Sequence, residues 1–216
     1  MADRYRNFQD LASATQRDTD YRIRLEDRGT APVILAPHGG TIEPGTAEIA
    51  EAIAGSDLSF YAFEALKAGE HGDFHITSHL FDEPHAVDLV GRASAAIAVH
   101  GRKDDGSETV WLGGRATDLR DAIGESLRAA GFDAALNTTL PGVHETNICN
   151  RTARGEGVQL ELPRVLRRRL TAEPDLLERF VLAIRDAIHT GCANRPGEDS
   201  ASSEIGSPSA ERGDPS

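Results

Sequence analysis

The sequence predicts an α/β fold with a mixed, mostly parallel central sheet flanked by helices. Two observations favour this fold class. Short apolar runs with the length of buried strands alternate along the chain with segments of helical periodicity. Glycine or proline stands at the end of several of these runs, where the chain has to turn before the next element begins. Strands that alternate with helices in this way are typical of a sheet whose faces are covered by helices.

Strands and helices follow from these patterns in chain order. The apolar or alternating runs predict strands over residues 32–40, 58–66, 74–81, 95–101, 108–114, 133–140 and 157–163. Helical periodicity predicts helices over residues 46–55, 84–93, 116–131 and 175–191. We expect Thr46 to cap the first of these helices and Gly55 to end it.

The chain is expected to form one domain over residues 1–190. Its 216 residues suffice for a domain of ordinary size with a substantial core. From Gly191 onward the sequence is acidic and rich in Gly, Ser and Pro, with almost nothing to bury. We therefore predict that residues 191–216 form a disordered tail, because such a composition cannot offset the entropy lost on ordering.

Composition excludes several classes of function. The formal net charge of -12 argues against binding of nucleic acid, which requires a basic surface. No apolar stretch reaches the ~20 residues of a membrane span, and the polar beginning of the sequence lacks the apolar core of a signal peptide. The two cysteines, Cys149 and Cys192, do not form a disulfide framework. We expect a cytoplasmic protein without membrane or nucleic-acid partners, and a monomer is the favoured state.

Two histidines occupy matching positions at the ends of predicted strands. His38 and His100 each follow a buried run and each precede a glycine, while Glu43 lies just before a predicted helix. Parallel strands would bring both imidazoles to one edge of the sheet, where α/β proteins bind their ligands. Two imidazoles and one carboxylate are a ligand set of catalytic zinc, which leaves a position for water. Strand-end histidines are also common as hydrogen-bonded structural residues, so these residues alone leave both interpretations open.

The remaining histidines have weaker signals. His71, His75, His79 and His85 lie close together in "HGDFHITSHLFDEPH". On the strand predicted there, His75 and His79 would share a face, which suits either a substrate contact or a purely structural role. His144 is a loop residue and a weak ligand candidate. His189 near the end of the last helix fits the helix dipole and is expected to be structural.

Four stretches of the sequence resemble a known family. "APHGGTIEPGTAEIAEAIAG", "HITSHLFDEP", "AIAVHG" and "NRTARGEGVQLELP" are similar to the poly-γ-glutamate hydrolases, often labelled phage-related replication proteins. This family is related to zinc carboxypeptidases, aspartoacylases and N-formylglutamate amidohydrolases. The resemblance covers nearly all of residues 18–190. It implies a zinc carboxypeptidase-like fold and a zinc ion bound by His38, Glu43 and His100.

Glu161 is the candidate general base. It lies in the apolar strand "GVQLELP", where Gln159 and Glu161 would share one face and Val158 and Leu160 the other. A glutamate in such a strand is costly unless it is paired or used, although a half-exposed strand would also explain it. The resemblance favours catalysis, since carboxypeptidase-like enzymes carry their base glutamate on a late strand.

Asn150 and Arg151 resemble the Asn-Arg pair with which carboxypeptidase-like enzymes bind a substrate carboxylate or stabilise the oxyanion. The pair follows His100 here, whereas in those enzymes it lies between the second and third metal ligands. Arg151 and Arg154 suit bidentate binding of a carboxylate, and a solvated loop is the alternative. We expect Asn150, Arg151, Arg154 and His79 to contact substrate, with Arg151 also assisting catalysis. Cys149 has no evident base beside it and is interpreted as a small buried residue.

These residues predict a zinc-dependent amidohydrolase that cleaves γ-glutamyl or similar amide bonds of an acidic polymer or acyl-amino acid. Three alternatives stay open: a small-molecule N-acyl amino acid deacylase, an inactive relative that binds metal, and a phage accessory protein that acts through protein contacts. The sequence has no G-x-S-x-G motif and no P-loop, so it offers no support for a serine hydrolase or a nucleotide-binding protein.

Overall fold

One sheet of seven strands organises the part of the chain that the computed structural model describes, residues 3–67 and 73–193. The strands are β1 (Tyr21–Glu26), β2 (Pro32–Gly40), β3 (Ser59–Ala65), β4 (Ala95–Arg102), β5 (Val110–Gly114), β6 (Ala134–Leu136) and β7 (Val158–Pro163). The helices are α1 (Phe8–Ala14), α2 (Thr46–Ala54), α3 (Pro84–Arg92), α4 (Thr117–Ala129), α5 (Arg164–Ala172) and α6 (Pro174–Ala193), with a 3-10 turn, η2, at Ile148–Asn150.

The sheet is mixed and mostly parallel, as predicted, with the strand order β1-β3-β2-β4-β7-β5-β6. The central strands β3, β2, β4 and β7 pair in parallel, so their carboxyl ends meet at one edge. The antiparallel pairs are β1 with β3 and β5 with β7. The register pairs His100 on β4 with Glu161 on β7, which brings two of the predicted site residues side by side.

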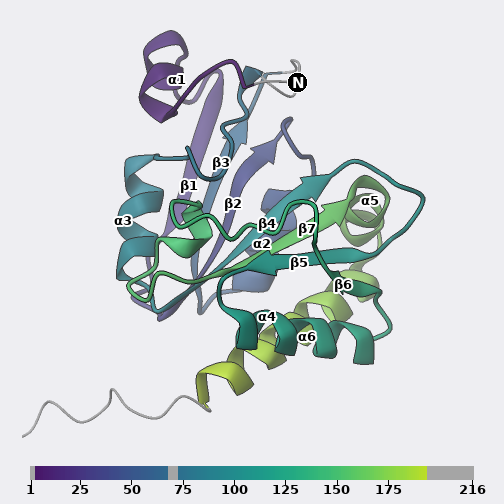
Figure 1. Ribbon diagram of the computed structural model, residues 1–216. Helices are drawn as coiled ribbons and strands as arrows, with labels where there is room; N and C mark the ends of the chain where they lie inside the picture. Colours follow the sequence, from purple (N-terminus) through teal and green to yellow (C-terminus); the bar gives the residue numbers. More distant parts are fainter. Residues whose placement is uncertain (1–2, 68–72, 194–216) are drawn as a thin grey trace, which may run out of the picture.

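Helices cover both faces of this sheet (Figure 1). One face packs against α2, α4, α5 and α6, and its core contains Ile34, Ile97 and Leu160. The opposite face packs against α1, α3 and η2, and its core contains Leu35 and Phe63. The alternation of side chains along each strand therefore assigns successive residues to two separate cores, which explains why the central strands read as continuous apolar runs.

An irregularity in β2 changes the direction of His38. Ala36 pairs with Ala62 of β3, but Gly39 pairs with Glu64, so three steps along β2 match two steps along β3. Ala36 belongs to the core beneath α2, and regular alternation would direct residue 38 to that same face. The extra residue reverses the alternation, as β-bulges do beside functional sites. His38 consequently lies next to His100 on the other face, with 5.0 Å between the ring centroids.

The prediction of a strand over residues 74–81 is wrong. This segment forms turns between β3 and α3 and joins no ladder. Its alternating apolar residues, Phe74 and Ile76, are buried under the loop in the core beside α1 and α3. The backbone N–H of Thr77 donates to the Asp3 carboxylate instead of to a neighbouring strand. The alternation of apolar and polar residues in this segment therefore reflects the burial of Phe74 and Ile76, and not the pairing of a strand.

Other boundaries differ in detail. The segments α1, β1 and α5 were not predicted, because their burial patterns are short or irregular. Gly45, with φ 95°, and not Thr46, is the N-cap of α2, while Gly55 ends the helix as expected. Helix α6 continues to Ala193, past the predicted domain end at residue 190. The predicted disordered tail beyond Ala193 lies outside the described residues, as does His71. No helix within the described ranges is long and apolar enough to cross a membrane.

Candidate active site

A cavity of about 860 Å³ opens at the carboxyl ends of β2, β4 and β7. Its walls come from these strand ends, from the loop at residues 75–79, from residues 102–105, and from the loop at residues 139–147. It has the size and the position expected of a ligand site in an α/β protein. None of the described residues that line a smaller hollow of about 410 Å³ between α4 and α6 is a histidine.

His38 is held in one tautomer by its surroundings. The side chain is 1% exposed, and its Nε2 lies 2.8 Å from the carbonyl oxygen of Ile76. A carbonyl oxygen only accepts, so Nε2 carries a proton and donates it. The other nitrogen, Nδ1, faces Glu43 and His100, at 3.3 Å from Glu43 Oε1. A ring fixed through one nitrogen by a backbone carbonyl is the usual arrangement of a metal-binding histidine.

His100 offers its Nδ1 to the same point. Its Nε2 lies 3.4 Å from the hydroxyl of Ser78, and its Nδ1 lies 3.2 Å from Nδ1 of His38. Glu43 completes the group, because its Oε2 lies 3.9 Å from Nδ1 of His100. The amide of Gly101 donates to this same Oε2 at 2.7 Å and holds the carboxylate in place.

Two facing Nδ1 atoms need a proton or a metal cation between them. Burial lowers the pKa of His38, but the charge of Glu43 and its hydrogen bond outweigh this, so the pKa is raised. Burial and the charge of His38 together lower the pKa of His100 to about 3. A proton on His38 therefore serves both rings and the carboxylate. A metal cation would satisfy the same three acceptors, so the donor set fits zinc.

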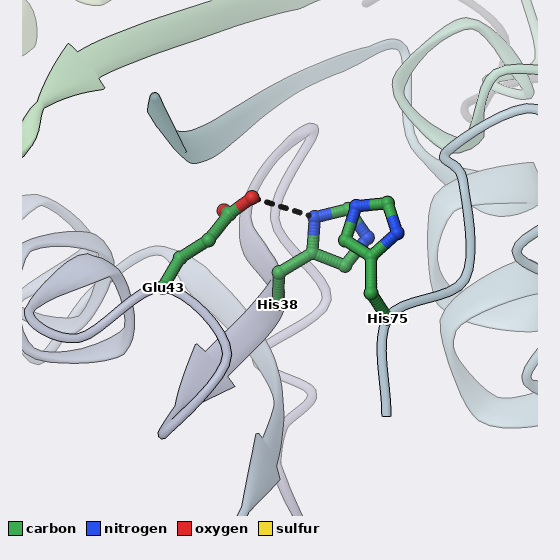
Figure 2. A group of neighbouring side chains, drawn as sticks. All are labelled: His38, Glu43 and His75. Atoms are coloured by element: carbon green, nitrogen blue, oxygen red, sulfur yellow. Dashed lines mark ion pairs between the residues drawn. The ribbon is translucent and has the colours of Figure 1, made fainter. Parts of the chain in front are cut away.

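His75 is a fourth potential ligand at this point. His38, Glu43 and His75 each offer one ligand atom, and these atoms lie within 4.8 Å of one another. Figure 2 shows Glu43 reaching His38 from one side while His75 lies over its ring, with 4.1 Å between the ring centroids. Burial, followed by the charge of His38, lowers the pKa of His75 to about 4, so the ring is neutral at neutral pH.

Glu161 lies in the cavity at the end of β7 and is 6% exposed. Burial and the nearby charge of Glu43 raise its pKa to about 8. Gln159 donates from Nε2 to Glu161 Oε1 at 2.7 Å, and Asn147 donates from Nδ2 to Gln159 Oε1 at 2.9 Å. This chain of amides holds one oxygen of Glu161 and leaves the carboxyl group with a fixed orientation.

The predicted Asn-Arg pair lies in a different environment. Asn150 is 1% exposed, and its Nδ2 donates to the carbonyls of Gly142 and His144. Arg151 donates from Nε to the carbonyl of Thr146 at 2.8 Å. Both side chains stabilise the 142–146 loop, and the described residues that line the cavity include neither of them. Arg154 is exposed and is likewise absent from that lining.

His79 does line the cavity, where its ring lies 5.0 Å from that of His144. Cys149 is fully buried, and burial raises the pKa of its thiol to about 12, which makes it unsuitable as a nucleophile.

Sequence reasoning missed several residues that support the site. Arg167 of α5 donates to the carbonyls of Pro44 and Leu162 and lies against Gly101, where an added Cβ would come within 2.5 Å of its guanidinium carbon. Gln159 and Asn147 orient Glu161, as described above. The only signal for Gln159 was its predicted position on the same strand face as Glu161. Arg167 and Asn147 carried no signal, because the partners that tie them to the site, Pro44 and Gln159, lie 123 and 12 residues away in the sequence.

Comparisons with known proteins identify the family of this chain. The profile of the poly-gamma-glutamate hydrolase family matches residues 5–181. The SPbeta prophage-derived UPF0714 protein YoqZ of Bacillus subtilis (strain 168) is 37% identical over 188 residues, which cover 86% of this chain. That match covers 65% of YoqZ, so the chain spans a little less than two thirds of this relative.

Two solved structures share the fold closely. A bacteriophage poly-gamma-glutamate hydrolase superposes with a TM-score of 0.84 at 28% identity, covering 90% of this chain and all of that one (100%). The zinc-free apo form of YndL superposes with a TM-score of 0.80 at 29% identity, covering 88% of this chain and 98% of that one. YndL is a UPF0714 protein of the same Bacillus subtilis strain. By the span of the family match and the identity of these relatives, the chain belongs to the poly-gamma-glutamate hydrolase family.

Proposed function

We propose that the protein is a zinc-dependent hydrolase that cleaves γ-glutamyl amide bonds of poly-γ-glutamate or of related acyl-amino acids. The observation that carries this proposal is the convergence of two Nδ1 atoms and one carboxylate beside the buried Glu161, within a cavity at the strand ends. The names of the relatives support it further, since one is called a poly-gamma-glutamate hydrolase and another was solved in a zinc-free form.

His38, Glu43 and His100 are the residues that would hold the metal. Their fit rests on the two rings whose Nε2 atoms already have oxygen partners on Ile76 and Ser78, so that both Nδ1 atoms face inward. A zinc ion in such a set acts as a Lewis acid and makes water nucleophilic near neutral pH. Glu43 also supplies the negative charge that two neutral imidazoles lack.

Glu161 would move the proton. As a carboxylate it accepts a proton from the attacking water, and as a carboxylic acid it donates that proton to the nitrogen of the departing amine. Gln159 holds Oε1, which leaves Oε2 as the oxygen that exchanges the proton. The pKa of about 8 reflects how strongly burial and the charge of Glu43 disfavour a second negative charge. A nearby cation would offset that repulsion and favour the base form.

The cavity suits an acidic substrate with methylene groups. Arg102 lines the cavity, is 7% exposed and stacks on Trp111 at 3.9 Å from the ring centroid. Its Nη atoms are held by Thr109 and Asp105, so the guanidinium is rigid. A γ-glutamyl unit carries a carboxylate for such a group. It also carries methylenes for the exposed apolar side chains at the rim, among them Leu140.

The test is incubation of the zinc-loaded full chain with poly-γ-glutamate, with the chain length of the polymer followed by size-exclusion chromatography. Poly-α-glutamate and a simple N-acyl glutamate serve as comparison substrates, and Glu161→Gln serves as the inactive control. We expect shortening of the γ-linked polymer alone. Turnover of the N-acyl amino acid without shortening of the polymer would instead identify a small-molecule deacylase. Bound zinc without turnover of any substrate would identify an inactive relative.

A further inference from the structure

A carboxylate near the start of the chain holds the loop that lies behind the two site histidines. Asp3 accepts three hydrogen bonds: at 2.6 Å from Nδ1 of His75, at 2.7 Å from the amide of Thr77, and at 2.6 Å from the hydroxyl of Thr77. Burial raises the pKa of Asp3, but the hydrogen bonds from Thr77 and His75 outweigh it, so the pKa is lowered and the group is ionised. One side chain thus satisfies three donors of a segment 72 to 74 residues away.

The held segment, His75–Ser78, supplies the partners of both site rings, and we name it the backing loop. The carbonyl of Ile76 accepts from Nε2 of His38, and the hydroxyl of Ser78 lies 3.4 Å from Nε2 of His100. The Ile76 carbonyl fixes the proton on Nε2 of His38, and the positions of these two oxygens orient both rings so that each Nδ1 points inward. The backing loop belongs to no strand, so no ladder fixes its conformation.

Two further contacts join the same parts of the chain but act outside the backing loop. Arg4 pairs with Asp73 at 3.3 Å, and both side chains are considerably exposed. The amide of Phe8 donates to Asp82 at 2.7 Å, on the other side of the loop. Neither contact reaches a residue between 75 and 78, where the oxygens that face the histidines lie. Of the described side chains in this segment, Asp3 is therefore the one whose hydrogen bonds reach the backing loop.

We propose that Asp3 is a positioning residue of the metal site, whose carboxylate keeps the backing loop in the conformation that directs both Nδ1 atoms to one point. The proposal rests on the metal site of the proposed function. It has a second consequence at His75: because an ionised carboxylate only accepts, Nδ1 of His75 carries the proton and Nε2 is left unprotonated. The third ring beside His38 therefore also presents an acceptor nitrogen.

Replacement of Asp3 tests this directly. Asp3→Asn keeps the size of the side chain but replaces one accepting oxygen by an NH₂ group, which cannot accept, and Asp3→Ala removes all three hydrogen bonds. Thr77→Val, a milder variant, removes only the hydroxyl contact. Asp10→Asn is the matched control, because it makes the same change in the same segment at an exposed ion pair with Arg6. Zinc affinity is measured by competition with a chromophoric chelator on the full chain.

Zinc affinity should fall roughly 10-fold in Asp3→Asn and more in Asp3→Ala. Loss of outer partners of metal ligands costs ~10–100-fold, and Asp3 acts one hydrogen bond further out. The zinc affinity of Thr77→Val should lie between that of these two variants and that of the unchanged Asp10→Asn control. In the metal-free protein, Asp3→Ala should lose hydrogen-exchange protection at the Thr77 amide, and the ¹⁵N shifts of His75 should report a change of tautomer in Asp3→Asn.

The outcomes separate this inference from the proposed function. If the wild-type chain binds zinc and Asp3→Asn binds it within twofold as tightly, Asp3 does not position the site and the inference is overturned. If the wild-type chain binds no zinc, the proposed function fails. Amide exchange in the metal-free protein then decides the inference: unchanged protection of Thr77 in Asp3→Ala overturns it, and lost protection supports the loop-holding role.

Discussion

The strand ends and the 142–154 loop both carry residues that the sequence marked as functional, yet the two regions use them differently. His38, His100 and Glu161 sit at the ends of paired strands, and their side chains meet in one cavity. Asn150 ends the short 3-10 turn η2 and Arg151 follows it, and their side chains donate to the carbonyls of the adjoining loop. A strand satisfies its backbone through the ladder, which leaves its side chains available for a site. A loop without a ladder needs its own side chains for this purpose.

Removal of the strand-end histidines should have the largest effect on the site. We expect close to one zinc per wild-type chain and a large loss of zinc in His38→Ala and in His100→Ala, because each variant lacks one of the three ligands of the proposed site. Elemental analysis of dialysed protein measures this. His189→Ala, at an exposed position of α6, is the control.

Replacement of His75 tests by the same measurement whether His100 or His75 is the third zinc ligand. His75 lies over His38 and offers a ligand atom, but His100 is the third ligand in the proposed site. His75→Ala should therefore retain zinc, with weaker affinity. Loss of zinc in His75→Ala together with its retention in His100→Ala would exchange the roles of these two residues.

Glu161→Gln should separate chemistry from metal binding. The amide keeps the shape of the side chain but cannot accept a proton, so kcat should fall by roughly 10²–10⁴-fold while zinc stays bound and KM changes little. Steady-state kinetics with poly-γ-glutamate measure this. Glu145→Gln, in the exposed loop outside the cavity lining, is the matched control. A large effect in Glu145→Gln alone would move the base to the loop.

The burial of Glu161 also predicts a pH effect in the metal-free protein. Its folded-state pKa of about 8 exceeds the ordinary value of 4.5, so the folded state binds this proton more tightly than the unfolded state does. The corresponding stability is fully present below pH 4.5 and is lost as the pH rises through about 8. Relative to wild type, Glu161→Gln should therefore gain stability between pH 5 and pH 8, by on the order of a few kcal/mol.

Denaturant unfolding at both pH values, with a chelator present, measures this difference. The sign matters more than the size, since a normal surface carboxylate gives no such gain. A constant difference between wild type and Glu161→Gln across the range would mean that Glu161 is ionised throughout. It would then have a compensating partner in the folded protein.

The loop arginines should give the smallest effects, and on stability more than on binding. Arg151→Ala leaves the carbonyl of Thr146 without its donor and should lower the free energy of unfolding by about 1–2 kcal/mol. Arg154→Ala, at an exposed position, should change it by less than about 0.5 kcal/mol. If Arg151 binds substrate directly, KM instead rises in a salt-dependent way while the unfolding free energy is unchanged.

Much of this fold follows from local pattern. The runs ending at His38 and His100 are apolar on both faces, the helix at residues 117–129 carries one apolar stripe, and glycine ends α2. Such features depend on the period of a segment and on the chemistry of its ends, and both are written in consecutive residues. The matching histidine-glycine ends of two buried strands were visible for the same reason.

The direction of His38 and the conformation of residues 74–81 depend on the tertiary structure. The irregularity at Ala36–Gly39 turns His38 to the face of His100, although plain alternation predicts the opposite face. The alternating segment at residues 74–81 forms a loop. Its Thr77 amide donates to Asp3, and its apolar residues are buried in the core beside α1 and α3. Periodicity records that a residue is buried, but not which distant group it meets. Hydrogen-bond partners 38 to 74 residues apart, such as Ile76 for His38 and Asp3 for Thr77, are determined only when the chain is folded.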